Sequence, residues 1–408
     1  MKKVLIVEDS LPIVALHKNI AIKAGLEPVI AMTFSEVKSL SSQFDDFFCA
    51  IIDYSLPDAP NGEAIDFILD AKVPSIVMTG MLDDKIREHI LELPVIDYIT
   101  KESKQAFHYL LSLLKKLQTN NNIKVLVVDD ASSARAYVRS LLLRHNFDVL
   151  LANSGKSALN VLKNNPDIKL VITDKEMPHM DGIELCNEIR ATHTKDDVSI
   201  IGISANSSQS LTAKFIKNGA NDFLQKPFCL EEFYCRVIQN IEYVQSIDII
   251  RKQANTDYLT DLANRRYYFN SAQPIMDSLD TSTVAMMDID DFKSINDNYG
   301  HDAGDIVLKT ISSLIQLHFE PKYLAARLGG EEFSVYFHDL ELEKAVKMLE
   351  NFRQELEKTK INVGSEIITC TVSIGVCQDK KDKLDSLLIL ADQKLYTAKE
   401  TGKNKVVF

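Results

Sequence analysis

The sequence lacks tryptophan and has few residues of the types that dominate disordered, fibrous or disulfide-bonded chains. Its 408 residues include no Trp, 14 Gly, 11 Pro and 6 Cys. Gly and Pro are too few for a disordered or collagen-like chain, and 46% hydrophobic residues supply several separate cores. The cysteines form no C-x-x-C pair and lie mostly among apolar residues, which favours buried reduced thiols over disulfides or a zinc site.

Long apolar runs are also missing. None approaches the roughly 18 residues that cross a bilayer, and the first apolar stretch, at 4–7, is too short for a signal peptide. We therefore expect a cytoplasmic protein without membrane insertion. The net charge of −12 opposes non-specific binding to nucleic acid, because such binding depends largely on basic side chains. A small anionic ligand would need local lysines, helix N-termini or metal ions.

The sequence contains an internal repeat of polar landmarks, each placed after a short apolar run. KKVLIVEDS at 2–10 recurs as IKVLVVDDAS at 123–132, and AIIDYSLPD at 50–58 has its counterpart in LVITDKEMPHMDG at 170–182. Four pairs keep a constant offset, apart from one length change before the last two: Asp9 and Asp130, Asp53 and Asp174, Thr79 and Ser204, Lys101 and Lys226. The repeat predicts two similar domains in the first 243 residues.

In each half, four short continuous apolar runs indicate parallel strands buried on both faces of a sheet. The segments between them, such as SEVKSLSSQF and GKSALNVLKNN, show helical spacing. This alternation predicts a doubly wound α/β fold with a parallel sheet, in which every landmark falls at the carboxyl end of a strand. Two adjacent carboxylates, a single Asp, a hydroxyl and a Lys should therefore meet in one crevice.

Three carboxylates in one crevice suit a hard cation such as Mg²⁺. With a metal and a lysine neutralising charge, the single Asp can attack a phosphoryl donor, and the Thr or Ser hydroxyl can then bind the phosphoryl group. A lone Asp after a strand is more commonly a loop cap. The complete pattern, present twice, favours the functional interpretation.

These landmarks resemble the receiver domain of two-component response regulators, twice over. The resemblance implies flavodoxin-like (βα)5 domains at 1–117 and 124–243 and a cognate histidine kinase or phosphotransfer protein as partner. It implies phosphoacceptors Asp53 and Asp174, with Asp53 preferred by analogy to other paired receivers, although the residues leave open which is used. It implies Mg²⁺ ligands Glu8, Asp9, Asp129 and Asp130, together with the acceptors Asp53 and Asp174 and the carbonyls of Ser55 and Glu176. The implied switch residues are Thr79, Tyr98, Lys101, Ser204, Phe223 and Lys226.

Two connections follow these domains. The polar segment QTNNN breaks a helical pattern and predicts a linker at 118–123. From Leu230 to about Gln253 apolar residues recur at helical spacing without Gly or Pro, which predicts that the last helix continues as a stalk over 244–254. Whether the stalk packs within the chain or pairs with a second copy is left open.

The remaining segment, 255–408, shows no helix-turn-helix signature, and the acidic charge further disfavours a DNA-binding role. Three motifs stand out, NTDYLTDLANRRYYF at 255–269, VAMMDIDDFKSINDNYGHDAGD at 284–305 and ARLGGEEFSVYF at 326–337. Asp288 ends an apolar strand, and the Gly pair places Glu331 and Glu332 at a tight turn between strands. Adjacent central strands would bring Asp288 and Glu331 together as a site for Mg²⁺ and a nucleoside triphosphate.

These motifs resemble the GGDEF domain of diguanylate cyclases, in its Gly-Gly-Glu-Glu-Phe form, over essentially all of 255–408. The resemblance implies an α+β ferredoxin-like or cyclase-like domain that works as a homodimer and joins two GTP molecules into cyclic di-GMP and pyrophosphate. It implies Asp288, Glu331 and the Ile289 carbonyl as Mg²⁺ ligands, Asn296 and Asp305 as guanine-reading residues, Phe292 and Lys293 in the phosphate loop, and Lys399 and Lys403 as phosphate contacts. Glu332, next to a metal ligand, could accept the proton of the attacking hydroxyl or orient that hydroxyl.

Some alternatives stay open at this point. Asn296 could merely form a turn and Lys399 could be solvated helix surface, although the complete spacing favours function. As alternatives to a phosphorylation-regulated cyclase, the chain could be a GTP or cyclic di-GMP sensor without turnover, or a phosphorelay scaffold. Many relatives also carry an Arg-x-x-Asp product-inhibition motif ahead of the Gly pair, where this chain has Glu320-Pro321-Lys322-Tyr323. We therefore expect weak or no feedback through that position.

Overall fold

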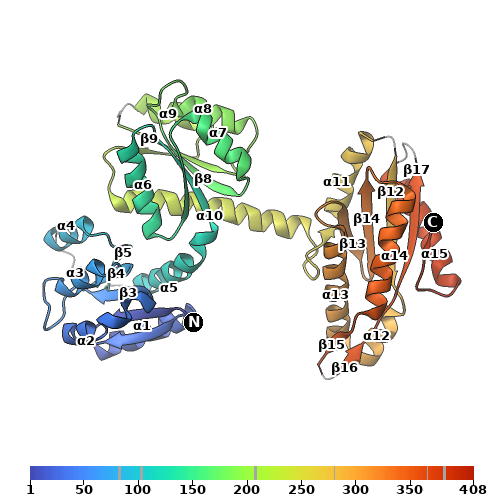
Figure 1. Cartoon of the computed structure of the whole chain (residues 1–408), viewed down its shortest axis with the longest axis horizontal. Helices are drawn as coiled ribbons and strands as arrows, with labels where there is room; N and C mark the ends of the chain where they lie inside the picture. Colours follow the sequence, from blue (N-terminus) through green and yellow to red (C-terminus); the bar gives the residue numbers. More distant parts are fainter. Residues whose placement is uncertain (81–83, 102–103, 206–208, 280, 365, 380–382) are drawn as a thin grey trace. The chain divides into compact units, whose positions relative to one another are not determined.

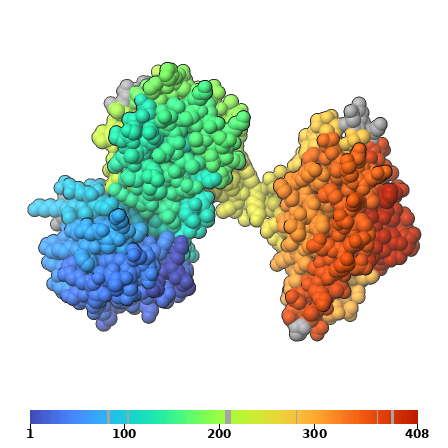
Figure 2. All heavy atoms as spheres, in the orientation of Figure 1, coloured from blue at the N-terminus to red at the C-terminus, as the bar shows by residue number. Residues whose placement is uncertain are grey.

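The computed structural model describes the chain apart from residues 81–83, 102–103, 206–208, 280, 365 and 380–382. It divides into two compact units, Met1–Ser246 and Ile247–Phe408, each with its own sheets and cores (Figure 1). In the space-filling view, the first unit is coloured from blue to green and the second from yellow to red (Figure 2). Among the described helices, none is long and apolar enough to span a membrane.

The first half of unit 1 is built on a parallel five-stranded sheet in the order β2-β1-β3-β4-β5. Its strands are β1 (Lys3–Val7), β2 (Glu27–Ala31), β3 (Phe47–Asp53), β4 (Ser75–Thr79) and β5 (Asp97–Thr100). Helices cover both faces because the central strands bury side chains on both sides. One face carries α1 (Leu11–Lys23) and α5 (Lys104–Thr119), and the other carries α2 (Phe34–Ser39), the 3-10 turn Ser41–Asp46, α3 (Glu63–Asp70) and α4 (Asp84–Glu92).

The second half of unit 1 repeats this fold, with the equivalent strand order β7-β6-β8-β9-β10 and parallel pairing throughout. Its strands are β6 (Lys124–Val128), β7 (Asp148–Ala152), β8 (Ile168–Asp174), β9 (Ser199–Ser204) and β10 (Asp222–Gln225). One face packs against α6 (Ser132–Arg144) and α10 (Leu230–Asn255), and the other against α7 (Gly155–Asn164), α8 (Gly182–Arg190) and α9 (Gln209–Lys217). The predicted doubly wound fold is confirmed in both halves.

The five strands that the receiver resemblance implied are present in each sheet, although the apolar runs alone indicated only four. The two remaining strands, β2 and β7, lie at the edge of their sheets and are partly exposed, so neither reads as a continuous buried run. Helix α5 continues to Thr119 before the 3-10 turn Asn120–Asn122. The Asn120 side chain is buried and donates to the His145 carbonyl at 2.8 Å, so this segment is packed. Helix α10 runs unbroken through the predicted stalk.

Unit 2 contains a mixed six-stranded sheet in the order β11-β13-β14-β12-β17-β18. The central strand β12 (Ser282–Ile289) is buried along its length and pairs antiparallel with its two neighbours. The other strands are β11 (Ala263–Asn264), β13 (Leu324–Gly329), β14 (Glu332–His338), β17 (Val372–Asp379) and β18 (Val406–Val407), with a separate hairpin of β15 (Ile361–Val363) and β16 (Glu366–Ile368).

Helices cover both faces of this sheet. Side chains of α12 (Phe292–Tyr299), α13 (His301–Phe319) and α14 (Leu342–Lys358) share one core with the sheet, while α11 (Arg265–Asp277) and α15 (Leu384–Glu400) share the other. The predicted α+β class is therefore confirmed for the last third of the chain.

Helix α15 packs so closely on β17 that one position requires glycine. A Cβ atom added at Gly375 would lie 2.1 Å from the carbonyl oxygen of Ala391 and 2.2 Å from the amide nitrogen of Leu395. We expect Gly375→Ala to lower the free energy of unfolding of unit 2 by about 2 to 3 kcal/mol, because helix backbone must move. Calorimetric unfolding of the full chain measures this, with Gly80→Ala as a control because its added Cβ meets no atom within 4 Å. Equal stability of both variants would contradict the close packing.

Candidate functional site

Three of the predicted carboxylates gather at the carboxyl ends of β1 and β3. Ligand oxygens of Glu8, Asp9 and Asp53 lie within 4.8 Å of one another. The Lys101 Nζ, just beyond β5, lies 2.7 Å from both Glu8 Oε2 and Asp53 Oδ2. With Thr79 at the end of β4, these residues line a cleft of about 510 Å³. The parallel sheet thus brings together landmarks that lie far apart in the sequence.

The electrostatics of this cleft favour a bound cation. Burial raises the pKa of the Asp53 carboxyl, while Lys101 acts in the opposite direction. Burial likewise raises the pKa of Glu8, which is only 1% exposed. Charged carboxylates in such a place are costly unless a positive charge is close. The all-oxygen donor set fits Mg²⁺.

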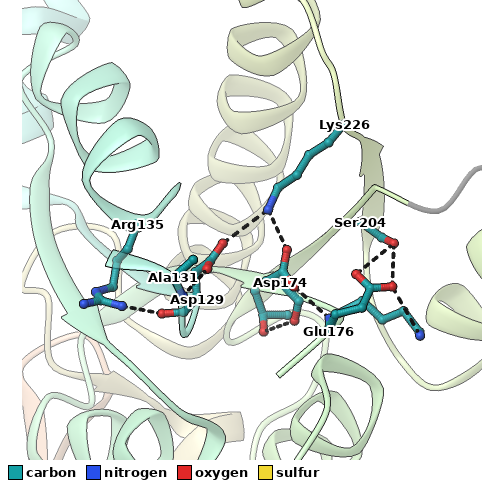
Figure 3. A network of polar contacts seen from close by, with 9 residues as sticks. Asp129, Ala131, Arg135, Asp174, Glu176, Ser204 and Lys226 are labelled. Carbon is teal, nitrogen blue, oxygen red and sulfur yellow. Dashed lines mark hydrogen bonds and ion pairs between the residues drawn. The ribbon is translucent and has the colours of Figure 1, made fainter. Parts of the chain in front are cut away.

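The second receiver-like half holds its landmarks in the same place, and its lysine contacts the two equivalent carboxylates (Figure 3). The Lys226 Nζ lies 2.6 Å from Asp174 Oδ1 and 3.2 Å from Asp129 Oδ2. Burial raises the pKa of the Asp174 carboxyl, and Lys226 opposes this shift. Asp130 is exposed, and within the described part of this half no three acidic side chains approach one another as closely as in the first. The predicted switch aromatic Phe223 is buried.

The predicted switch aromatic of the first half is bound to a residue of the second. The Tyr98 hydroxyl donates to Glu231 Oε1 at 2.9 Å, and Arg87 Nη2 lies 2.6 Å from the same oxygen. Burial would raise the pKa of Glu231, but hydrogen bonds from its own backbone amide, Arg87 and Tyr98 hold it below its usual value. Glu231 lies in the first turn of α10. Sequence reasoning missed this contact because no local pattern pairs residues so far apart.

In unit 2, Asp288 lies close enough to Glu331 and Glu332 to feel their charges. It lies near the end of β12, directly across from Glu332 on β14, and Lys399 Nζ contacts its Oδ1 at 2.8 Å. Burial raises the pKa of Asp288, Lys399 lowers it, and the charges of Glu331 and Glu332 raise it further. The structure therefore brings the predicted metal-binding carboxylates to one place, next to a predicted phosphate-binding lysine and the strand end that carries Ile289.

A salt bridge holds the turn that carries these glutamates. Arg327 donates to the Gly330 carbonyl oxygen from Nε at 2.9 Å and from Nη2 at 2.7 Å. Its Nη1 lies 3.0 Å from Asp257 Oδ1, and Asp257 also accepts from the Thr260 hydroxyl. Sequence reasoning singled out the motif around Asp257 without giving it a role. Its residues anchor the acidic turn to the start of the unit.

The predicted guanine-reading residues lie on neighbouring helices. A Cβ added at Gly304 would lie 2.0 Å from Asn296 Oδ1, so the Asn296 side chain rests against the first turn of α13, next to Asp305. In the predicted phosphate loop, Phe292 is buried in the core and Lys293 is exposed.

The second predicted phosphate-binding lysine, Lys403, pairs with an unexpected acid. Its Nζ lies 2.6 Å from Asp291 Oδ1. The neighbouring Asp290 accepts hydrogen bonds from the hydroxyls of Thr371 and Ser373 and from the Asn404 amide. Asp290 thus fixes β17 and the C-terminal segment to the phosphate loop, and its oxygens are already occupied.

Comparison with known proteins gives two family matches. Residues 125–238 match the family described as "Response regulator receiver domain", and residues 254–405 match "Diguanylate cyclase, GGDEF domain". The response regulator PleD of Caulobacter vibrioides is 29% identical over 299 residues, which cover 70% of this chain and 65% of that protein. The probable diguanylate cyclase DgcT of Escherichia coli is 36% identical over 181 residues, which cover 43% of this chain and 39% of that protein.

A solved structure is similar over a longer part of its own length. The crystal structure of a two-component system response regulator/GGDEF domain protein is 37% identical, with a TM-score of 0.53, and the match covers 60% of this chain and all of that one. The chain spans less than two thirds of the length of the two curated relatives. Residues 1–117 are identified as receiver-like by their sheet, which has the same strand order as the sheet of the second half of unit 1.

The raised carboxyl pKa values in the first half predict a pH-dependent metal site. Mg²⁺ binds the ionised carboxylates, so a raised pKa lets protons compete at a higher pH than at an ordinary Asp. We expect Mg²⁺ affinity to fall as pH is lowered from about 8 to about 5.5. Calorimetric titration of full-length Asp174→Asn/Asp288→Asn isolates this site, and adding Asp53→Asn serves as the control that removes it. Affinity that stays constant over this range would contradict the assignment.

Proposed function

Because the chain belongs to the family of response regulators that carry a GGDEF domain, we propose that it is a phosphorylation-regulated diguanylate cyclase. It condenses two GTP molecules into cyclic di-GMP and pyrophosphate. The observation that carries this proposal is Asp288 at the end of the central strand, facing Glu332 and joined by the charge of Glu331. Receivers at 1–117 and 124–243, a linker at 118–123 and a stalk at 244–254 would control the cyclase at 255–408.

The donor set of the acidic cluster fits Mg²⁺, since Asp288, Glu331 and the Ile289 carbonyl all offer oxygen. Bound there, Mg²⁺ would neutralise charge on the triphosphate of GTP. Lys399 and Lys403 are held by Asp288 and Asp291 and lie at the same end of the sheet. On GTP binding these lysines exchange carboxylate partners for phosphate oxygens. Lys403 supplies a point charge where arginine, with its two-pronged grip, is common in the family.

Base recognition falls to the neighbouring helices. The Asn296 side chain offers a donor and an acceptor, and the Asp305 carboxylate can accept from the N1 and N2 groups of guanine. Gly304 between them leaves room for Asn296, because any side chain there would strike its amide oxygen. Phe292 secures the phosphate loop through its burial, and Lys293 follows it.

The reaction joins two half-sites. The 3′-hydroxyl oxygen of one GTP bonds to the α-phosphorus of the other as the bond to pyrophosphate breaks, and this happens twice per product. Glu332 is placed beside the metal-binding carboxylates and can accept the hydroxyl proton. Because each domain positions one GTP, activity belongs to a homodimer, and positioning with charge neutralisation supplies most of the acceleration.

Control is proposed to start at Asp53, phosphorylated by a histidine kinase or phosphotransfer protein. Among the residues that the structure describes, three carboxylates of the predicted receiver sites come within 4.8 Å of one another only in the Asp53 cleft. Thr79 binds the new phosphoryl group, and Tyr98 then changes position. Because Tyr98 is hydrogen-bonded to Glu231, movement of Tyr98 would break or shift this contact with the first turn of α10, a helix that runs on to Asn255. The receivers thus change the population of productive dimers.

Incubating the full-length protein with GTP and Mg²⁺, with and without beryllofluoride as a phosphoryl mimic, tests the proposal. We expect cyclic di-GMP, separated by chromatography, at a rate that beryllofluoride raises about tenfold or more. Asp53→Asn should keep the basal rate and lose this stimulation, while Asp288→Asn should abolish turnover. Bound GTP without product, even with beryllofluoride, would refute the cyclase in favour of a sensor.

A further inference from the structure

The two receivers differ at the residue two positions after the predicted acceptor. The first has Ser55, with a short side chain, and the second has Glu176. Figure 3 shows the Glu176 side chain reaching toward Ser204 at the end of β9. The Ser204 hydroxyl lies 3.1 Å from Oε1 and 3.2 Å from Oε2 of this carboxylate. A carboxylate therefore already accepts the hydrogen bond that the sequence assigned to a phosphoryl group.

The surroundings make this contact specific. Ser204 is fully buried, whereas the Glu176 side chain is about half exposed, so the carboxylate reaches inward from the surface. Lys175 Nζ lies 3.4 Å from Glu176 Oε1, while Lys226 is occupied by Asp174 and Asp129. The Glu176 amide also donates to Asp174 Oδ2 at 2.7 Å. Backbone and side chain of one residue thus join the acceptor to the switch hydroxyl.

A carboxylate can imitate a phosphoryl group at this position. Both groups are anions with oxygen acceptors, and a hydroxyl donates to either. The aromatic residue Phe223 is buried here, while its counterpart Tyr98 bonds outward to Glu231. In the second receiver, the switch hydroxyl of Ser204 is bonded to a carboxylate and the switch aromatic is buried. In the first receiver, three predicted metal ligands lie close together and the switch aromatic is hydrogen-bonded to Glu231.

We propose that Glu176 is an internal competitor of the aspartyl phosphate for Ser204. Its carboxylate keeps the Ser204 hydroxyl bonded in the absence of phosphorylation and disfavours phosphoryl transfer to Asp174. Asp53 is then the acceptor that responds to a phosphoryl donor. For Asp174 to be phosphorylated, Glu176 must leave Ser204 and two anions must then share the site. The inference rests on the proposed function only in taking Asp53 and Asp174 as phosphoryl acceptors.

Acetyl phosphate with Mg²⁺ is the probe. The Asp carboxylate oxygen bonds to phosphorus as the phosphorus–oxygen bond to acetate breaks, and the protein gains one phosphoryl group that intact-protein mass spectrometry counts. In full-length Asp53→Asn protein, labelling at Asp174 should be slow. Adding Glu176→Ser, which copies the first receiver, should speed labelling about threefold or more. Unchanged labelling would overturn the proposal.

Two comparisons separate the contact from a general effect of charge. In a Ser204→Ala background the acceleration by Glu176→Ser should vanish, because the competitor has lost its partner. An equal acceleration with and without Ser204 would overturn the proposal in favour of simple repulsion. Conversely, adding Ser55→Glu to the Asp174→Asn protein should slow labelling of Asp53. Unchanged labelling of Asp53 would count against the mechanism.

These readouts are protein masses and do not depend on cyclic di-GMP. A chain that shows the predicted labelling but makes no cyclic di-GMP would refute the cyclase and support the role of Glu176. A chain that makes cyclic di-GMP, but in which Asp174 is labelled at the same rate with Glu176 as with Glu176→Ser, would support the cyclase and refute the role of Glu176.

Discussion

A lysine paired with buried carboxylates is the interaction on which all three sites depend. Lys101 lies between Glu8 and Asp53, Lys226 lies between Asp129 and Asp174, and Lys399 contacts Asp288. Burying carboxylates without a counter-charge costs several kcal/mol, and repulsion between them adds to this cost. One ammonium group lowers it and keeps the oxygens close together. The lysine at each site thus stabilises the close approach of the carboxylates around it.

The same pairing also makes the sites responsive. Each lysine occupies oxygens that Mg²⁺ would take, and each is the group that a phosphate would attract. We propose that binding exchanges partners within this set of charges. In the second receiver a further carboxylate, Glu176, has joined this set and takes the hydroxyl of Ser204. The carboxylate of Glu176, where the first receiver has Ser55, would thus give two receivers of the same fold different responses to a phosphoryl donor.

Sequence reasoning located what depends on local order. The acids follow apolar strands, and parallel strands end at one edge of a sheet, so the convergence of Asp53 and Lys101 could be predicted from spacing alone. The central strand β12 and the turn before Glu332 were predictable for the same reason. The edge strands β2 and β7 were not, because partial exposure removes the continuous apolar signal.

The reach of individual side chains could not be predicted. Glu231 binding Tyr98, Asp257 holding Arg327 and Asp291 holding Lys403 join residues that no pattern relates. Their geometry depends on rotamers and on the packing of separate elements. Glu176 is instructive, because the family resemblance assigned only its backbone carbonyl. Its side chain differs from that of Ser55, and only the structure shows that this difference reaches Ser204.

The most direct test of the lysine account is Mg²⁺ affinity in full-length Lys101→Met, in the Asp174→Asn/Asp288→Asn background at about pH 8. Removing a cation that contacts both Glu8 and Asp53 at 2.7 Å should tighten Mg²⁺ binding about threefold or more, because the metal no longer displaces or faces the ammonium group. Unchanged or weaker Mg²⁺ binding would contradict the account, because Lys101 and the metal would then not share the same oxygens.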